Sequence, residues 1–359
     1  DPAETLVYVV TYVTSWGEEG PPSAASTAVT WRPGQTVNLT SIPVAPAGAY
    51  DVTHKRIYRS AAGSNSTKFQ LVTTSDLAVA TTTYNDTALT AALGETLATT
   101  GWVPPSDTMT GLRGLPNGIM VGFVNNTVCF CEPYAPYAWP TRYQYALDGP
   151  VVAVGVYGQQ VLASTARSLY VATVTDPASV NFEKQALAQV IVSKRSVVEM
   201  LGGVIFASPD GLWQWGGGSA FVNITEKIMA VEDWRAYVPS SIHAYEADNA
   251  YVGFYNTGSV TGSMIFRFGE TPTFTTSDIY ATAGFRDKAR DLLFVCAGGA
   301  GANQIKKWDF GSAATYDWTS GVFHLEAPVN MACARVDAAT YPVTFKLYAD
   351  GTLKHTETV

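Results

Sequence analysis

The stretch VVEMLGGVIFASPDGLWQWGGG, residues 197–218, decides the fold of this 359-residue chain. A short apolar run leads to a Gly-Gly turn, a second apolar run, a Pro-Asp-Gly turn and a third run with two tryptophans. Apolar runs of this length, bounded by glycine, proline and aspartate, are typical of strands joined as antiparallel hairpins. The stretch therefore predicts one small antiparallel sheet.

Stretches with the same plan recur along the chain. They cover residues 117–133, 151–174, 197–218, 242–270 and 280–310. A repeat of roughly 35–50 residues is typical of the blades of β-propellers. We predict a β-propeller of about five or six degenerate blades over residues 101–325, with an array of sandwiches or a solenoid as the alternative.

The flanking segments are also β-rich. Residues 1–100 contain alternating strands around Gly, Pro and Asn turns, and TTGWVPPSD at 99–107 is a proline-rich linker. The first segment is predicted to be a β-sandwich that resembles a fibronectin type III module with its pieces in permuted order. Residues 326–359 end in a hairpin pattern at Asp350-Gly351, which is a C-terminal hairpin or the start of a further β domain. The fold class is thus all-β, with a helical pattern only at residues 224–238.

Composition excludes several classes of protein. Apolar residues make up 47% and charged residues 14%, which argues against disorder. The net charge is −8 and no run of Lys or Arg is present, so a phosphate-gripping nucleic-acid binder is not expected. No apolar stretch approaches the roughly 18 residues of a membrane span. Neither the four cysteines nor the four histidines show metal-ligand spacing, and no metal or cofactor is predicted.

Aromatic residues interleaved with prolines mark one candidate interface. In PYAPYAWP, residues 133–140, the side chains of Tyr134, Tyr137 and Trp139 lie between three prolines, which a central strand does not accept. Exposed, they would form a surface for a subunit contact or for stacking on a sugar. The alternative is a loop that folds back on the propeller and fills a gap.

Two further phrases are candidate sites. In SKRS, residues 193–196, Lys194 and Arg195 could form a salt bridge between subunits or between blades, or lie in a solvated turn. The phrase SPDGLWQW, residues 208–215, loosely resembles the Asp-box turn of sialidase-type propellers. We interpret it as a structural turn, with Asp210-Gly211 at the tip and Trp213 and Trp215 on one face of the next strand. The structural-turn residues are Ser208, Asp210, Gly211 and Trp213.

No catalytic motif is assembled in the sequence. There is no Gly-x-Ser-x-Gly elbow, no His-Glu-x-x-His and no P-loop ending, and the carboxylates are scattered. We therefore predict that the chain is not an enzyme. A glycoside hydrolase on a propeller is kept as an alternative, because sequence alone does not show whether two carboxylates converge.

The middle of the chain resembles a known group of proteins. LPNGIMVGF and VCFCEPYAPYAWPTRYQY within residues 115–145, VSKRSVV at 192–198 and ASPDGLWQW at 207–215 are similar, in the same order, to phrases of virion proteins of tailed bacteriophages. An IYRS-like strand precedes them, as at residues 57–60 here. The resemblance implies a structural component of the tail nozzle or hub of short-tailed phages, located in the virion tail.

The same resemblance implies the partners. Identical subunits would form a ring, often of six, by heterologous contacts below the portal and adaptor, and other tail proteins would adjoin it. DNA would pass as cargo, and an acidic wall would let it pass without sticking. The alternative function is a receptor- or carbohydrate-binding module of a tail fibre or spike.

Overall fold

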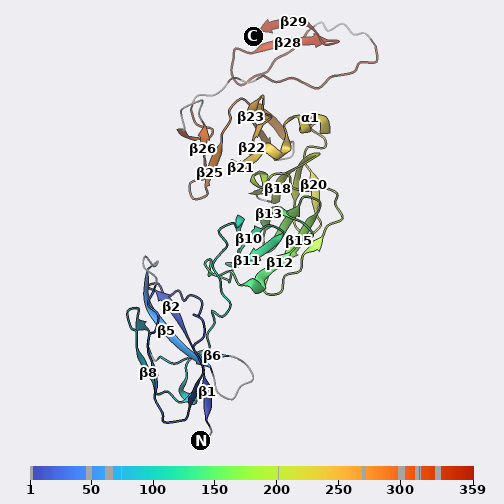
Figure 1. Cartoon of the computed structure of the whole chain (residues 1–359). Coiled ribbons are helices and arrows are strands. Elements are labelled where there is room, and N and C mark those ends of the chain that lie inside the picture. Colours follow the sequence, from blue (N-terminus) through green and yellow to red (C-terminus); the bar gives the residue numbers. More distant parts are fainter. Residues whose placement is uncertain are drawn as a thin grey trace. The chain divides into compact units, whose positions relative to one another are not determined.

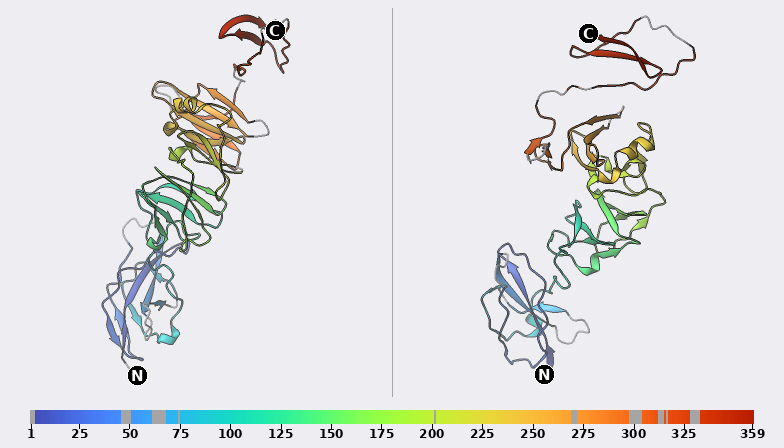
Figure 2. Two further views of the ribbon diagram at one scale, coloured as in Figure 1. Left: turned by 90° about the vertical axis from the view of Figure 1, so that its right-hand side faces the viewer. Right: turned by 45° about the horizontal axis from the view of Figure 1, so that its top comes forward.

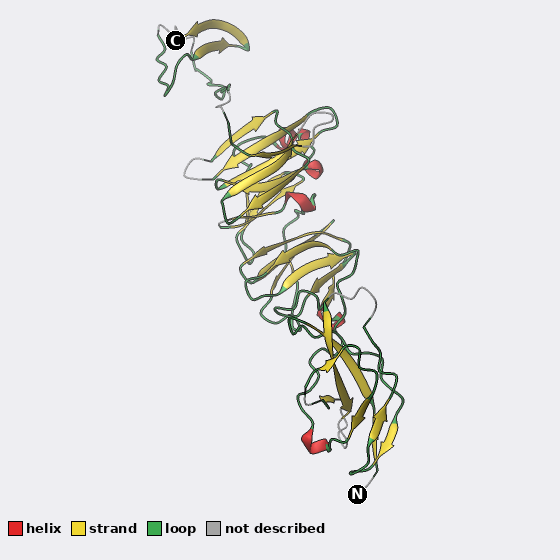
Figure 3. Ribbon diagram, turned by 90° about the vertical axis from the view of Figure 1, so that its left-hand side faces the viewer, coloured by secondary structure: helices red, strands yellow, loops and turns green. Residues whose placement is uncertain are grey.

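A computed structural model describes residues 3–45, 51–60, 68–73, 75–200, 202–268, 272–297, 304–311, 315, 317–327 and 333–359 (Figure 1). The chain divides into two compact units, Asp1–Asp309 and Phe310–Val359. In the described part of both units, strands are the main regular secondary structure and helices are few and short (Figure 3). The prediction of an all-β chain is confirmed.

The first strands of the chain form a β-sandwich. Alternation of Val and Tyr with Thr places one face of each strand in a core with Leu6, Tyr8, Trp31 and Ile57. One sheet has the order β2 (Tyr8–Thr14), β5 (Val52–Ser60) and β6 (Phe69–Leu71), with β7 (Leu77–Ala78) also on β5. Two further pairs are β1 (Glu4–Leu6) with β3 (Val29–Trp31), and β4 (Val37–Leu39) with β8 (Tyr84–Asp86), followed by the 3-10 turn η1 (Thr90–Ala92).

A buried ion pair joins the sandwich strands. The Arg59 guanidinium on β5 lies 2.7 Å from the Asp86 carboxylate on β8, and both side chains are fully buried. The Tyr8 hydroxyl donates to the same carboxylate oxygen at 2.8 Å, and Arg59 lies 5.1 Å from the centre of the Trp31 ring. Four strands therefore meet at one polar cluster inside an apolar core.

Five antiparallel sheets follow in the described residues, and the chain completes each before it begins the next (Figure 2). The first four have four strands in chain order and the fifth has three. Their strands are β9 (Thr110–Gly114), β10 (Met120–Val124), β11 (Thr127–Phe130) and β12 (Gln144–Ala146); β13 (Val151–Tyr157), β14 (Gln160–Thr165), β15 (Leu169–Thr173) and β16 (Glu183–Lys184); β17 (Val198–Met200), β18 (Gly203–Ser208), β19 (Gly211–Trp215) and β20 (Phe221–Asn223); β21 (His243–Ala247), β22 (Ala250–Asn256), β23 (Thr261–Arg267) and β24 (Thr273–Ser277); and β25 (Ala283–Asp287), β26 (Leu292–Ala297) and β27 (Gln304–Lys307).

The sheets stack as the blades of a propeller do. The first strand of each sheet lies against the first strand of the next, from β9 through β13, β17 and β21 to β25. Four apolar clusters fill the spaces between consecutive sheets. Residues that alternate along one strand therefore belong to different clusters, as Ala153 and Val154 of β13 show.

Each of the five predicted blocks overlaps one of the five sheets, and the predicted class of sandwich followed by propeller-like blades is confirmed. The blocks were predicted with three strands each, and the additional strands β9, β12, β16, β20 and β24 lie outside their predicted bounds. The helical pattern at 224–238 forms a shorter helix, α1 (Val231–Ala236), which buries Trp234. Short 3-10 turns are η2 (Thr141–Tyr143), η3 (Lys194–Ser196) and η4 (Pro239–Ser241). The predicted domain boundaries at residues 100 and 325 stay a prediction.

The second unit contains one hairpin, β28 (Thr344–Ala349) with β29 (Thr352–Thr358). Its turn lies at Asp350-Gly351, where both residues have a positive φ, as a tight hairpin turn requires. Nothing in the described part of the chain is a helix long and apolar enough to cross a bilayer.

Candidate interaction sites on the sheet array

Trp139 covers the outer face of the first sheet. Its side chain is 2% exposed and packs with Cys129 of β11 and with Cys131, which directly follows that strand. The backbone N–H of Trp139 donates to the carbonyl of Val103, and the indole Nε1–H donates to the carbonyl of Pro136 at 2.8 Å. Burial at this face raises the pKa of the Cys129 thiol to about 11. At Trp139, the loop folds back on the sheet, as one of the two alternatives expected.

The two tyrosines of the same loop differ from Trp139. Tyr134 is 81% exposed and has a left-handed backbone, with φ of 59°. Its ring lies over Gly118, where a Cβ would be 2.5 Å from the ring, so the close approach requires glycine. Tyr137 is half-buried edge-on against Trp102, and burial is the main cause that raises its pKa. Of the three aromatics, Tyr134 is therefore the one open to a partner.

Lys194 and Arg195 connect sheets within the chain. Both lie in η3, the turn that precedes the third sheet. The Lys194 ammonium donates to the Thr110 hydroxyl of the first sheet at 3.0 Å. The Arg195 guanidinium donates to the Thr282 carbonyl, just before the fifth sheet, at 2.8 Å. The contacts are between blades, as one alternative expected, but the partners named here are neutral oxygens and not carboxylates.

A charged contact that the sequence does not indicate joins the first strand of the first sheet to the first strand of the third sheet. The Arg113 guanidinium of β9 lies 3.4 Å from the Glu199 carboxylate of β17, and it also donates to the Val197 carbonyl. Glu199 accepts from the backbone N–H of Val156 at 3.2 Å. Burial raises the pKa of Glu199, and Arg113 opposes that shift. Arg113 and Glu199 are 86 positions apart, so no local pattern indicates the pair.

The hairpin between β18 and β19 has a different turn from the predicted one. Ser208 pairs directly with Gly211, so Pro209 and Asp210 form the tip and Gly211 is the first residue of β19. The predicted tip at Asp210-Gly211 is wrong by one residue, because Pro209 occupies the first turn position that its fixed φ favours. Gly211 is required for packing instead, since a Cβ there would lie 2.4 Å from the Thr225 hydroxyl oxygen.

Hydrogen bonds occupy the polar groups of this turn. One Asp210 carboxylate oxygen accepts from the Trp213 indole at 2.9 Å, and the other accepts from the Gln189 amide at 2.7 Å. The Ser208 hydroxyl donates to the Val190 carbonyl at 2.8 Å. Trp213 and Trp215 share one apolar cluster, as predicted. These contacts support the interpretation of the phrase as a structural turn.

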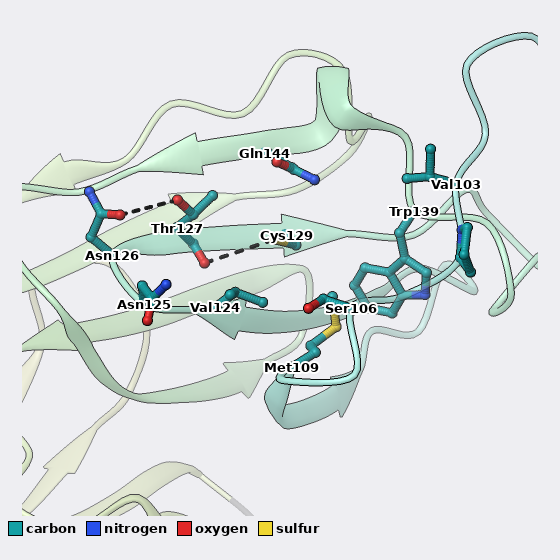
Figure 4. A pocket seen from close by; sticks show the side chains of 11 residues that line it. Val103, Ser106, Met109, Val124, Asn125, Asn126, Thr127, Cys129, Trp139 and Gln144 are labelled. Atoms are coloured by element: carbon teal, nitrogen blue, oxygen red, sulfur yellow. Dashed lines mark hydrogen bonds between the residues drawn. The ribbon is translucent and has the colours of Figure 1, made fainter.

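A pocket of about 340 Å³ opens on the outer face of the first sheet (Figure 4). Cys129 and Gln144 are cross-strand partners and both line it, so the pocket lies on the same face that Trp139 covers. Val103, Met109 and Val124 add apolar groups to its wall, and Ser106, Asn125, Asn126 and Thr127 add polar ones. Within the described ranges, no group of three or more His, Cys, Asp or Glu side chains is placed to hold a metal ion.

Comparison with known proteins finds similarity to solved structures but not to protein families or curated sequences. No protein-family model and no curated protein matches the chain. Among solved structures, PorZ, a bacterial surface component of the type-IX secretion system of Porphyromonas gingivalis, is 13% identical with a TM-score of 0.33 and covers 84% of this chain. AztD from Citrobacter koseri is 8% identical with a TM-score of 0.34 and covers 82% of this chain and 77% of its own length. The chain spans 41% of the PorZ structure, and neither likeness is high enough to assign a function.

Proposed function

We propose that the chain is a structural subunit of a bacteriophage tail. Copies of it would form the tail nozzle, a ring around the DNA exit channel. It is not proposed to be an enzyme. The resemblance of its phrases to virion proteins of tailed phages is the starting point. The −8 net charge suits a channel wall that DNA passes without binding.

The position of the resembling phrases carries the proposal. CEPYAPYAWP covers the first sheet through Trp139, SKRS joins sheets through Lys194 and Arg195, and SPDGL closes a hairpin through Asp210. Each phrase therefore holds the array together and leaves its polar groups hydrogen-bonded. A function that acts through shape and subunit contact fits this use of the residues better than a reaction does.

Location in the particle tests the proposal. An antibody raised against the purified chain is applied to particles of the phage whose genome encodes it, with gold detection in the electron microscope. The expected result is gold at the end of the tail, close to its axis. Gold on the capsid or none on intact and opened particles overturns the proposal.

A second candidate function is glycan binding by a tail fibre or spike module. The observation that favours it is the exposed Tyr134 ring, since exposed aromatic faces stack on sugars. Binding to a panel of host-surface polysaccharides, compared between the chain and Tyr134→Ala, tests it. A loss of binding in the variant supports this function, and equal or absent binding by both proteins rejects it.

A further inference from the structure

The outer face of the fifth sheet carries exposed apolar side chains, and no other described sheet of the first unit packs on it. Strand β26 alternates, and its residues Leu293 and Val295 pack against the fourth sheet. The opposite face carries Phe285, which pairs with Phe294, and Ile305, which pairs with Cys296. Phe285 is 67% exposed and Ile305 is 75% exposed.

The other sheet faces of the array are packed differently. At the junctions between consecutive sheets, large apolar side chains are buried by the neighbouring sheet, as Phe206 is by the second sheet and Phe254 by the fifth. The outer face of the fifth sheet continues this series of interfaces, with the same alternation but with its aromatic and branched side chains in solvent. The occupant that this series predicts is another β-sheet face.

The outer face of the first sheet is the complementary surface at the other end of the series. Its pocket of about 340 Å³ has an apolar part, formed by Met109, Val124, Cys129 and Trp139. Its polar part is formed by Ser106, Asn125, Asn126, Thr127 and the exposed Gln144. Leu112 of β9 is 50% exposed. One end of the array thus presents protruding apolar groups. The other end presents a pocket whose walls mix apolar and polar side chains.

We propose that the outer face of the β25–β27 sheet binds the outer face of the β9–β12 sheet of a second copy of the chain. Phe285 and Ile305 supply the side chains that enter the pocket beside Trp139. Because the two faces are unlike, the contact is heterologous, and a heterologous contact repeated between identical subunits closes a ring or extends a filament. This inference rests on the proposed function and names the surface through which the ring is built.

Substitutions on each face test the contact. Analytical ultracentrifugation over a range of concentrations is used on the whole chain, on Ile305→Asp and Phe285→Asp, and on Gln144→Arg. The matched control is Val222→Asp, at an exposed apolar position, 60% accessible, on the outer strand β20. Thermal melts verify that each variant is folded.

The expected result is self-association of the chain that each of the three face variants weakens by about tenfold or more, while Val222→Asp does not. A charge at either face would be taken out of water without a partner, which is the reason for the loss. A chain that stays monomeric at all concentrations, or an association that the three variants leave unchanged, overturns the inference.

Cross-linking identifies the partner surface. Benzoylphenylalanine replaces Phe285 in ¹⁵N-labelled protein, which is mixed with unlabelled protein, irradiated and mapped by mass spectrometry. Mixed-isotope links to residues 103–144 support the contact between copies. Links within one copy alone, or links elsewhere, contradict it. If antibody-bound gold lies at the tail end but the association and cross-linking tests fail, this surface is rejected and the proposed function stands. If the association and cross-linking tests succeed but no gold lies at the tail end, the proposed function is rejected and the contact between copies stands.

Discussion

The buried pair Arg59–Asp86 is the residue-scale feature on which the sandwich depends most. Asp86→Asn leaves the Arg59 charge buried without its partner. Removal of one partner of a buried ion pair costs about 3–5 kcal/mol. We expect a loss of that size in urea unfolding of the sandwich, followed by Trp31 fluorescence.

The control for this prediction is an ion pair of the same kind at the surface. Asp248 and Arg267 lie 2.8 Å apart with side chains 79% and 52% exposed. Asp248→Asn is expected to cost no more than about 1 kcal/mol. Equal losses in Asp86→Asn and Asp248→Asn would show that the buried pair has no special role.

The buried side chain of His243 leads us to expect that acid destabilises the sheet array. Its ring is buried against Phe254 and Tyr280, Nε2 has no hydrogen-bond partner, and burial together with Arg195 lowers its pKa from 6.5 to about 4. Between these values the unfolded chain binds a proton that the folded chain does not. Stability is therefore complete above about pH 6.5 and falls as the pH drops toward 4, by at most about 1.4 kcal/mol per pH unit.

The pH dependence of unfolding checks this prediction. Urea unfolding of the chain and of His243→Phe is measured from pH 7 to pH 4, and the exposed His54 supplies the matched control His54→Phe. We expect His243→Phe to lose less stability on acidification than the chain itself. Parallel curves for the chain and for His243→Phe would mean that His243 is not the group that titrates.

Trp139 and Tyr134 belong to one loop, but their substitution by alanine is expected to change stability by very different amounts. Trp139→Ala removes a buried ring from the face of the first sheet and is expected to destabilise the array by about 3–5 kcal/mol. Tyr134→Ala removes an 81% exposed ring and is expected to change stability by less than about 1 kcal/mol. Thermal or urea melts decide. A larger loss in Tyr134→Ala than in Trp139→Ala would contradict the described packing.

At the scale of the elements, Gly211 decides how the third sheet closes. Gly211→Ala places a Cβ against Thr225, whose hydroxyl accepts from the backbone N–H of Leu212. Overpacking of this kind costs about 1–3 kcal/mol. Gly114, also in a strand, has open space around it, and Gly114→Ala is expected to stay within about 1 kcal/mol. The free energies of unfolding of the two variants are compared, and equal values would reject the packing role.

The strands were predictable because their signals are local. Apolar runs and turn residues located all five sheets, since each hairpin is specified within about 20 residues, as at 197–218. The turn at Pro209-Asp210 was misplaced by one residue because both candidate pairs contain a good turn former. That error moved Gly211 from a packing role to a turn role.

The candidate sites were less predictable from the sequence, because they depend on which sheet packs against which face of its neighbour. Whether Trp139 is buried or exposed depends on the first sheet having a face that no other sheet covers. The same reasoning applies to Phe285 and Ile305 at the fifth sheet, which have the apolar alternation of a covered face. Contacts such as Lys194 with Thr110 join residues 84 positions apart, and no spacing pattern carries that information.

At the scale of the whole molecule, weak charge and strong β content fit a subunit that works in an assembly. Only 14% of the residues are charged, and the net charge is −8. Surfaces buried between subunits need few charges, and an acidic wall does not retain DNA.

The most direct measurement of the proposed function is a cryo-electron microscopy reconstruction of the tail of the phage that is proposed to encode the chain, with the chain fitted into its density. The account predicts several copies around the tail axis in a closed ring that surrounds a DNA-sized channel. Within each copy, the outer face of the β25–β27 sheet would adjoin the β9–β12 sheet of its neighbour. Density for the chain in separate projections away from the axis, or as an isolated copy, would contradict the account.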